Sequence, residues 1–211
     1  MQRRFSYALT AGILSSGVTS DLPGIRFARP LVFALFGYIL GRQADELAEL
    51  SETDALTSLL NARGFASRLR SEIKRAKRYG EPLSLLFLDL DGLKDINDRY
   101  GHRAGSEALR EVAGVIRAEL RESDTGARWG GDEFTIIAPN TTKAAAMLFA
   151  ERIRASIAHH VSEWPMTASI GIATVDWREG TLASDAQTLL RDADAAMYEA
   201  KRRGKNAVAA A

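Results

Sequence analysis

The sequence predicts an α/β (or α+β) fold in which helices pack on one central sheet of about five strands. Short apolar runs typical of strands alternate along the chain with longer segments whose apolar residues recur every three or four positions, as in amphipathic helices. In addition, Gly130 and Gly131 precede two carboxylates and an apolar run at residues 134–138. Adjacent glycines supply the positive φ angles of a tight turn, so this stretch predicts a β-hairpin whose tip carries Asp132 and Glu133.

Composition limits the classes of function. The 211 residues suffice for one good-sized core. The 28 Lys and Arg residues nearly balance 27 Asp and Glu residues, so a net charge of +1 gives no overall field that favours nucleic acid. The chain has no Cys and only three His residues, which excludes disulfides and thiolate metal sites and disfavours a His-rich zinc site. Any metal should therefore be held by oxygen.

Residues 1–50 form a separate N-terminal segment in this interpretation, and its strongest feature is the apolar run Leu31–Gly41. Its 11 residues would reach about 16 Å as a helix, short of the roughly 30 Å of hydrocarbon that a membrane span crosses. The run could be the inner end of a membrane helix, an interfacial helix or a dimerising helix. Arg3 and Arg4 precede an apolar stretch as in a signal peptide, but no clean small-residue cleavage site follows.

A short stripe closes the N-terminal segment, since Leu40, Ala44, Leu47 and Ser51 are spaced four, three and four residues apart. This spacing is typical of a plain amphipathic helix. It is equally typical of a parallel two-stranded stalk that would hold two copies of the following domain together. Fewer than two heptads leave both interpretations open.

Residues 51–211 are the globular part, which opens with a polar connector at residues 53–63. Apolar runs predict strands at 83–90, 166–175 and 206–209 in addition to the hairpin. Helical periodicity predicts helices over residues 65–79, 142–160 and 183–203, and a further helix that ends at residue 120.

Two acidic clusters are the candidate functional residues. Residues 83–90 are nearly all apolar, as in a buried central strand, and Asp89 and Asp91 share one face at its end. Carboxylates in such a place need a counter-charge, and a divalent cation is one natural solution. The second cluster, Asp132 and Glu133, can join the first only if the two strands are neighbours; by itself it would also suit an ordinary polar turn.

Cations that could face a triphosphate occur at Lys94 and in the cluster Lys201–Lys205, although the helix dipole alone also favours cations at the end of a helix. Three or four carboxylates beside them would suit Mg²⁺. The chain has no GxxxxGK loop and no dinucleotide-binding fingerprint, which excludes the common phosphate-binding loops.

Five motifs occur in register between residues 52 and 209: Asp54-x-Leu56-Thr57-x-Leu59-x-Asn61, Asp89-x-Asp91-x-x-Lys94-x-Ile96-Asn97-Asp98-x-x-Gly101-His102-x-x-Gly105, Gly130–Phe134, Ser169-Ile170-Gly171-Ile172 and Ala196-Met197-Tyr198-x-Ala200-Lys201-x-x-Gly204-Lys205-Asn206. In these motifs the chain resembles the GGDEF domain, the catalytic domain of bacterial diguanylate cyclases. The resemblance implies a nucleotidyl-cyclase-like, mostly antiparallel sheet flanked by helices. It makes residues 51–211 the catalytic domain.

The resemblance also implies the reaction. Two NTP-loaded domains of a homodimer would face each other, and each 3′-hydroxyl would attack the α-phosphate of the opposite nucleotide. The products would be a 3′,5′-cyclic dinucleotide and two pyrophosphates. The implied cofactor is Mg²⁺, with two ions per active site and Mn²⁺ as a substitute.

Residue roles follow from the resemblance position by position. The metal ligands would be Asp89, Asp132, Glu133 and the Leu90 carbonyl, and Lys94 completes the catalytic set. The nucleotide would contact Gly92, Leu93, Lys94, Asn97, Ser106, Lys201 and Lys205.

Arg121 and Asp124 match the RxxD site at which relatives bind their product as an inhibitor, and Arg152 occupies the place of an additional arginine. Guanidinium groups suit phosphate and the Hoogsteen edge of guanine. The alternative for Arg121 and Asp124 is a plain i, i+3 salt bridge at a helix end.

Ser106 departs from the family pattern, which has Asp at this position. A carboxylate there accepts hydrogen bonds from guanine and repels the lone pair of adenine N1, whereas a hydroxyl can donate or accept. The change should weaken guanine binding by about 1–3 kcal/mol and remove the repulsion of adenine. In this respect the chain resembles the promiscuous GGDEF subgroup that makes cyclic AMP-GMP, so both GTP and ATP are expected substrates.

Two other functions stay open. The chain could be a strict GTP-only diguanylate cyclase, or a degenerate GGDEF domain that serves as a nucleotide receptor. Intact metal-ligand positions favour an enzyme, because a receptor needs no metal. The resemblance implies a cytoplasmic, bacterial catalytic domain without a nucleic-acid partner, and residues 1–50 are the part that could tether it to the inner membrane.

Overall fold

The computed structural model describes residues 33, 35–39, 41–42, 51–160, 164–177 and 185–211. The chain divides into two compact units, Met1–Ser51 and Glu52–Ala211. The predicted signal-like stretch and most of the stripe that begins at residue 40 lie outside the described residues. The described residues between 33 and 42 are helical, and their large apolar side chains, such as Phe33 and Tyr38, are exposed. Among the described helices, none combines the length and the hydropathy that a membrane span needs.

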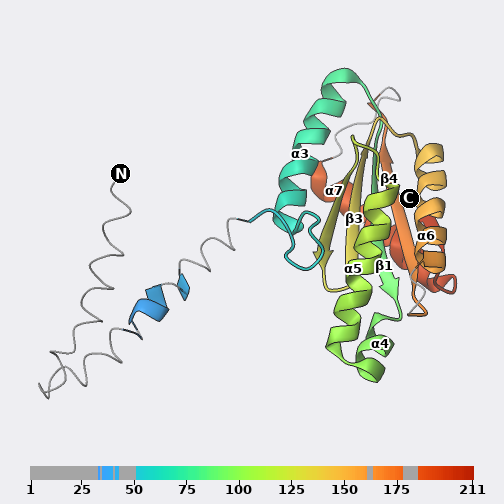
Figure 1. Cartoon of the computed structure of the whole chain (residues 1–211). Helices are drawn as coiled ribbons and strands as arrows, with labels where there is room; N and C mark the ends of the chain where they lie inside the picture. The colour runs from blue at the N-terminus through green and yellow to red at the C-terminus, as the bar shows by residue number, and fades with distance from the viewer. Residues whose placement is uncertain (1–32, 34, 40, 43–50, 161–163, 178–184) are drawn as a thin grey trace, which may run out of the picture. The chain divides into compact units, whose positions relative to one another are not determined.

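The second unit is built on a five-stranded sheet with the strand order β2-β3-β1-β4-β5 (Figure 1). Its strands are β1 (Leu83–Asp91), β2 (Thr125–Gly130), β3 (Glu133–Pro139), β4 (Thr167–Val175) and β5 (Val208–Ala210). The central strand β1 pairs antiparallel with β3 and β4, and β2 pairs antiparallel with β3. Among the pairs formed by these five described strands, the pair of β4 and β5 is the parallel one. The predicted α/β fold with a mostly antiparallel sheet is confirmed.

The helices are α3 (Ala62–Tyr79), α4 (Leu93–Tyr100), α5 (His102–Glu119), α6 (Lys143–His160) and α7 (Ala186–Arg202). Because side chains alternate along β1, Leu86, Leu88 and Leu90 pack with α5 and α6, whereas Leu85 and Phe87 pack with α3 and α7. Figure 1 shows these two helix layers on opposite faces of the sheet. Asp89 and Asp91 continue the odd-numbered row, and therefore end β1 on the face that α7 covers.

Helix ends follow the local chemistry. The side chain of Asn61 caps α3 by accepting the Gly64 N–H at 2.9 Å, and Gly80 ends the helix with a left-handed φ of 64°. Helix α7 begins after its cap Asp185; positions 183 and 184 of the predicted helix lie outside the described residues. The last strand begins at Val208, two residues later than predicted, because Asn206 still belongs to a turn with φ 45°.

The connector at residues 53–63 is more than a polar link. Leu60 forms a bridge to Ala127 of β2, its N–H donates to the Gly126 carbonyl, and its carbonyl accepts the Arg128 N–H at 2.8 Å. The segment that leads into the domain is thereby paired with the hairpin strand β2.

Candidate functional site

The two acidic clusters meet at one end of the sheet. In the register of β1 and β3, Asp89 pairs with Glu133, and the Leu90 N–H donates to the Asp132 carbonyl at 3.2 Å. The condition that their strands be neighbours is therefore met. The hairpin differs from prediction in one detail: Gly131 has a positive φ of 26°, but Gly130 does not, because Gly130 is still the last residue of β2. The pairing of β2 with β3 shifts register between Arg128 and Gly130.

One cation balances part of this negative charge. The Lys201 ammonium of α7 lies 2.7 Å from Oδ2 of Asp89. Burial raises the pKa of Asp89 above its ordinary value; the hydrogen bond from Lys201 opposes this shift and the charge of Asp132 adds to it. Burial, together with the charges of Asp89 and Asp132, also raises the pKa of Glu133. Carboxylates that raise each other's pKa repel each other when ionised, so the binding of a further cation beside them is favourable.

The chemistry of these donors fits Mg²⁺. Across the described part of the chain, no three Asp, Glu, His or Cys side chains already surround a common metal position, and Asp89 is held by Lys201. The oxygens of Asp89, Asp132 and Glu133 are nevertheless hard ligands at one strand end, and a divalent cation would relieve the repulsion that raises their pKa values. These residues could hold the metal, together with the carbonyl of Leu90.

A pocket of about 430 Å³ opens beside the acidic tip. Helices α4 and α5 and the hairpin supply its walls: Leu93, Lys94, Asn97, Asp98, His102, Gly105, Ser106, Leu109, Arg128, Gly131 and Asp132. The structure thus brings Lys94, Asn97 and Ser106 together with Asp132, one of the acidic residues. The volume and the mixed polar lining suit a nucleotide base with part of its sugar.

Two details shape the wall that α4 and α5 share. Gly105 allows the Asn97 amide to lie against α5, since a Cβ at position 105 would come within 2.1 Å of Asn97 Oδ1. The Ser106 hydroxyl donates to the His102 carbonyl at 2.9 Å, one turn back in the same helix. Its oxygen can still accept a hydrogen bond from a ligand N–H.

The start of α4 suits a phosphate. Gly92, with φ 95°, precedes the helix, and no side chain caps the first-turn N–H groups of Leu93 and its neighbours. Uncapped N–H groups and the helix dipole together favour an anion. Lys94 stands in this first turn, whereas Lys205 lies on an exposed turn after α7 and does not line the pocket.

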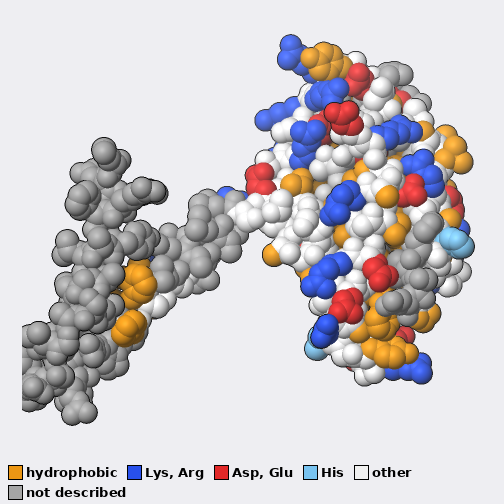
Figure 2. All heavy atoms as spheres, in the orientation of Figure 1, with side chains coloured by type: hydrophobic (Ala, Val, Ile, Leu, Met, Phe, Trp, Pro, Cys, Tyr) orange, Lys and Arg blue, Asp and Glu red, His pale blue; other side chains and the backbone are white. Residues whose placement is uncertain are grey.

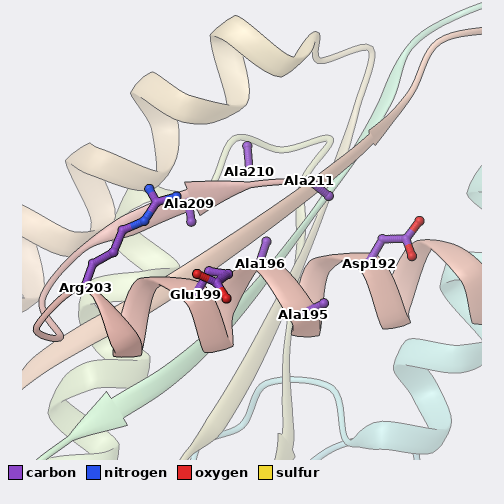
Figure 3. Close-up of a pocket in the computed structure, with 8 residues that line it drawn as sticks. All are labelled: Asp192, Ala195, Ala196, Glu199, Arg203, Ala209, Ala210 and Ala211. Atoms are coloured by element: carbon purple, nitrogen blue, oxygen red, sulfur yellow. The ribbon is translucent and has the colours of Figure 1, made fainter.

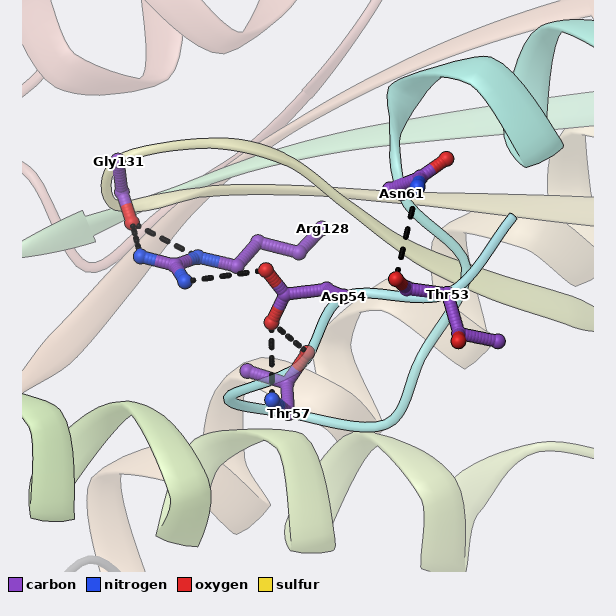
Figure 4. A network of polar contacts seen from close by, with 6 residues as sticks. All are labelled: Thr53, Asp54, Thr57, Asn61, Arg128 and Gly131. Carbon is purple, nitrogen blue, oxygen red and sulfur yellow. Dashed lines mark hydrogen bonds and ion pairs between the residues drawn. The ribbon is translucent and has the colours of Figure 1, made fainter. Parts of the chain in front are cut away.

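Arg128 and Asp54 were not predicted as site residues, yet they hold the hairpin tip (Figure 4). The Arg128 guanidinium donates twice to the Gly131 carbonyl, at 2.6 and 3.1 Å, and once to Asp54 at 3.3 Å. Asp54 also accepts the N–H and hydroxyl of Thr57 at 2.8 and 2.7 Å. Burial acts to raise the pKa of Asp54, but the bonds from Thr57 and Arg128 outweigh it and lower that pKa. The sequence signals were the place of Arg128 two residues before Gly130 and the presence of Asp54 and Thr57 in the first of the five motifs.

The residues of the predicted inhibitory site lie around the end of α5. Asp124 accepts the backbone N–H of Arg121 at 3.0 Å, so the i, i+3 contact is a turn rather than a side-chain salt bridge. Arg152 of α6 donates to the Glu119 carboxylate at 2.5 Å and to its carbonyl at 2.9 Å. The Arg121 side chain is exposed.

A second pocket, of about 260 Å³, lies between α7 and β5 (Figure 3). Alanines make up most of its lining, and it contains none of the predicted site residues. On the face shown in Figure 2, basic and acidic side chains of the second unit are interspersed. The pocket beside the hairpin is therefore the candidate site.

Comparison with known proteins identifies the family of the chain. Residues 51–207 match the model of the GGDEF family, described as "Diguanylate cyclase, GGDEF domain". The response regulator PleD of Caulobacter vibrioides is 39% identical over 176 residues, which are 80% of this chain and 38% of PleD. Diguanylate cyclase A of Treponema denticola is 37% identical over 77% of this chain and 45% of its own length. The chain thus spans less than half of these relatives.

Solved structures share the fold. The GGDEF domain of DgcB from Caulobacter crescentus, in complex with c-di-GMP, is 30% identical with a TM-score of 0.69, over 75% of this chain and 92% of that one. The diguanylate cyclase SiaD of Pseudomonas aeruginosa, in complex with its activator SiaC, is also 30% identical, with a TM-score of 0.70 over 99% of this chain and 82% of SiaD.

Proposed function

The chain belongs to the GGDEF family of diguanylate cyclase domains, and from this we propose that it condenses two GTP molecules into cyclic di-GMP and also accepts ATP. The observation that carries the proposal is the convergence of Asp89, Asp132 and Glu133 beside the pocket that Lys94 and Ser106 line. Acidic groups for a metal, cations for phosphates and polar groups for a base then lie within one site.

In this function, Mg²⁺ would be held by Asp89, Asp132, Glu133 and the Leu90 carbonyl. Bound there, it would lower the pKa of the 3′-hydroxyl and offset negative charge on the phosphates. The Lys201 ammonium is paired with Asp89. Once the metal neutralises Asp89, this ammonium would be free to bind the triphosphate.

The protein's own groups would orient the reactants. The first-turn N–H groups of α4, with Lys94, Lys201 and Lys205, would bind the triphosphate and align its α-phosphate with the incoming 3′-oxygen. Each linkage forms one bond from a 3′-oxygen to phosphorus, breaks the bond to the β-phosphate, and releases one pyrophosphate and one proton. Because each domain supplies one nucleotide, cyclisation needs a homodimer.

Ser106 supports the choice of both bases. With its proton donated to the His102 carbonyl, the hydroxyl oxygen would accept a guanine N–H; turned the other way, the same hydroxyl would donate to adenine N1. The cost of turning is small, because it gives up one ordinary hydrogen bond, worth about 0.5–1.5 kcal/mol. Asn97, positioned by Gly105, would contact the base in either case.

Arg121, Asp124 and Arg152 would bind product and inhibit the enzyme. The exposed Arg121 side chain and the guanidinium of Arg152 near the end of α5 could donate paired hydrogen bonds to phosphate or guanine.

Residues 1–50 would tether the catalytic unit to the cytoplasmic side of a membrane through apolar side chains such as Phe33 and Phe36, which are exposed.

One assay tests the proposed function. The full chain is incubated with Mg²⁺ and GTP, ATP or an equimolar mixture, and the products are separated by chromatography and identified by mass. We expect cyclic di-GMP from GTP and cyclic AMP-GMP from the mixture, with no product from Asp132→Asn. Cyclic di-GMP alone from the mixture would reject ATP as a substrate. No cyclic product in any reaction would reject the cyclase and leave a nucleotide receptor.

The Ser106→Asp variant tests the base argument in the same assay. A carboxylate should restore the preference for guanine, so the ratio of cyclic di-GMP to cyclic AMP-GMP should rise by about 5- to 150-fold, the equivalent of 1–3 kcal/mol. An unchanged product ratio would show that position 106 does not select the base.

A further inference from the structure

Asp91 is a buried carboxylate that the proposed reaction does not use. Only 8% of the residue is exposed. Its oxygens accept the Thr167 hydroxyl at 2.9 Å, the Ser169 hydroxyl at 3.0 and 3.2 Å, and the backbone N–H of Asn206 at 3.1 Å. Although it shares a face of β1 with Asp89, this side chain is thus committed to donors from β4 and from the turn after α7. Asp91 is therefore not one of the proposed metal ligands Asp89, Asp132 and Glu133.

The turn that Asp91 holds comprises residues 203–206 and follows Lys201 closely. The N–H groups of Gly204 and Lys205 both donate to the Lys201 carbonyl at 3.2 Å. Gly204, Lys205 and Asn206 all have positive φ angles, of 116°, 65° and 45°. For Lys205 this backbone region is unfavourable, so the turn needs contacts from outside to keep its shape.

Two carboxylates of one strand therefore hold this segment at two points. Asp89 binds the ammonium of Lys201, and Asp91, two residues further along β1, binds the backbone of Asn206. We propose that Asp91 is a positioning residue: it fixes the 203–206 turn so that Lys201 and Lys205 present their ammonium groups to the triphosphate. This inference rests on the proposed function for the identity of the ligand.

The loss of Asp91 should act locally. Beyond the turn, the Ala207 carbonyl accepts the Ile170 N–H at 2.9 Å, and β5 pairs with β4. The Asn206 side chain also accepts a bond from Arg154 at 2.7 Å. These contacts do not involve Asp91, so β5 and α7 should keep their places when the turn is released.

The test is Asp91→Asn in the full chain, because an amide keeps the size of the carboxylate but turns an NH₂ group toward the three donors. We expect the KM for GTP to rise about tenfold while kcat falls less than threefold. The backbone amides of residues 204–206 should exchange hydrogen at least tenfold faster than in the wild type.

Ser84→Ala is the matched control. Ser84 is a fully buried hydrogen-bonding residue at the opposite end of β1, where its hydroxyl contacts the Thr141 carbonyl at 2.8 Å and the Thr174 hydroxyl at 2.7 Å. A purely structural role of Asp91 predicts that both variants lower Tm and shift KM alike, and that result would overturn the proposal. Unchanged exchange at 204–206 in Asp91→Asn would also overturn it.

Failure of the proposed function would look different. If the wild type forms no cyclic product, the cyclase assignment falls. The positioning role is then judged by hydrogen exchange and by the Kd for GTP, measured with Ca²⁺ in place of Mg²⁺. A Kd that rises about tenfold in Asp91→Asn but not in Ser84→Ala supports it, and an equal Kd in both variants rejects it.

Discussion

Single residues decide how tightly the pocket is built, and Gly105 shows this most directly. A methyl group at position 105 would collide with the Asn97 amide at 2.1 Å. Gly105→Ala is therefore expected to displace Asn97 and to raise the KM for GTP about tenfold, as misplacement of a binding group does. Steady-state kinetics on the full chain measure the change.

Gly114→Ala in the same helix is the control for Gly105→Ala. An added Cβ at position 114 meets nothing within 4 Å, so this variant should gain about 0.5–1 kcal/mol of stability from helix propensity and keep its KM. Equal KM values for the two variants would show that the Asn97 amide does not contact the nucleotide.

Glu133 illustrates a residue whose charge costs stability. Burial and the charges of Asp89 and Asp132 raise its pKa in the folded state. A raised pKa contributes stability that is full below the pKa of the unfolded chain and is lost as pH rises through the folded pKa. Glu133→Gln should thus be more stable than the wild type at pH 7, and the difference should vanish in acid.

Thermal unfolding of both proteins between pH 3 and 8, without metal, checks this expectation. Glu122→Gln, which removes the same charge from an exposed position, should leave Tm unchanged. A Glu133→Gln protein that is less stable than the wild type at pH 7 would contradict the repulsion argued for the acidic cluster.

At the scale of elements, the hairpin tip depends on the segment that enters the domain. Arg128 joins the Gly131 carbonyl to Asp54, and Asp54 closes the turn at Thr57. Asp54→Asn should loosen the tip, lower kcat about tenfold and cost about 1–2 kcal/mol of unfolding free energy, because hydrogen bonds to a charged group are lost. Kinetics and denaturant unfolding measure the two effects.

The pH dependence of the same variant follows from the lowered pKa of Asp54. A depressed pKa gives stability that is present above the pKa of the unfolded chain and is lost as pH falls through the folded pKa. The gap between wild type and Asp54→Asn should be constant from pH 8 to about 5 and close in stronger acid. Arg103→Gln, which breaks the exposed pair with Glu107, should cost under about 0.5 kcal/mol at any pH.

How much of this site could be predicted depends on the distance along the chain between partners. The apolar run at residues 83–90 and the glycines before Asp132 are local patterns, so β1 and the hairpin were both predictable. By contrast, Asp91 bonds Asn206 across 115 positions, and Arg128 bonds Asp54 across 74. Local periodicity carries no information on such pairs. The motifs that carry the family resemblance include Asp54, Asp91 and Asn206, but the resemblance implied no role for them, and Arg128 lies outside those motifs.

The whole molecule adds a requirement that one folded unit cannot meet. In the described part of each chain, one acidic cluster adjoins the pocket of about 430 Å³ that suits a nucleotide base with part of its sugar, so the proposed function assigns one nucleotide to each chain. A cyclic dinucleotide has two linkages, and under the proposed mechanism each is made between nucleotides of different chains. Two active sites must therefore face each other, and a dimer with one inactive site should form no cyclic dinucleotide.

Mixing experiments turn this requirement into a number. If wild type and Asp132→Asn exchange freely at constant total protein, an equal mixture should retain about a quarter of the wild-type rate of cyclic product, because only a quarter of randomly formed dimers have two wild-type chains. A mixture that retains about half would mean that one competent site suffices. Exchange of subunits between the two proteins must be complete before the rate is measured. A tag that changes the size of the Asp132→Asn chain allows this to be checked, because the tagged chain then co-purifies with the wild type. Retention near a half after full exchange would contradict the two-site mechanism, and retention near a quarter would exclude catalysis by single chains.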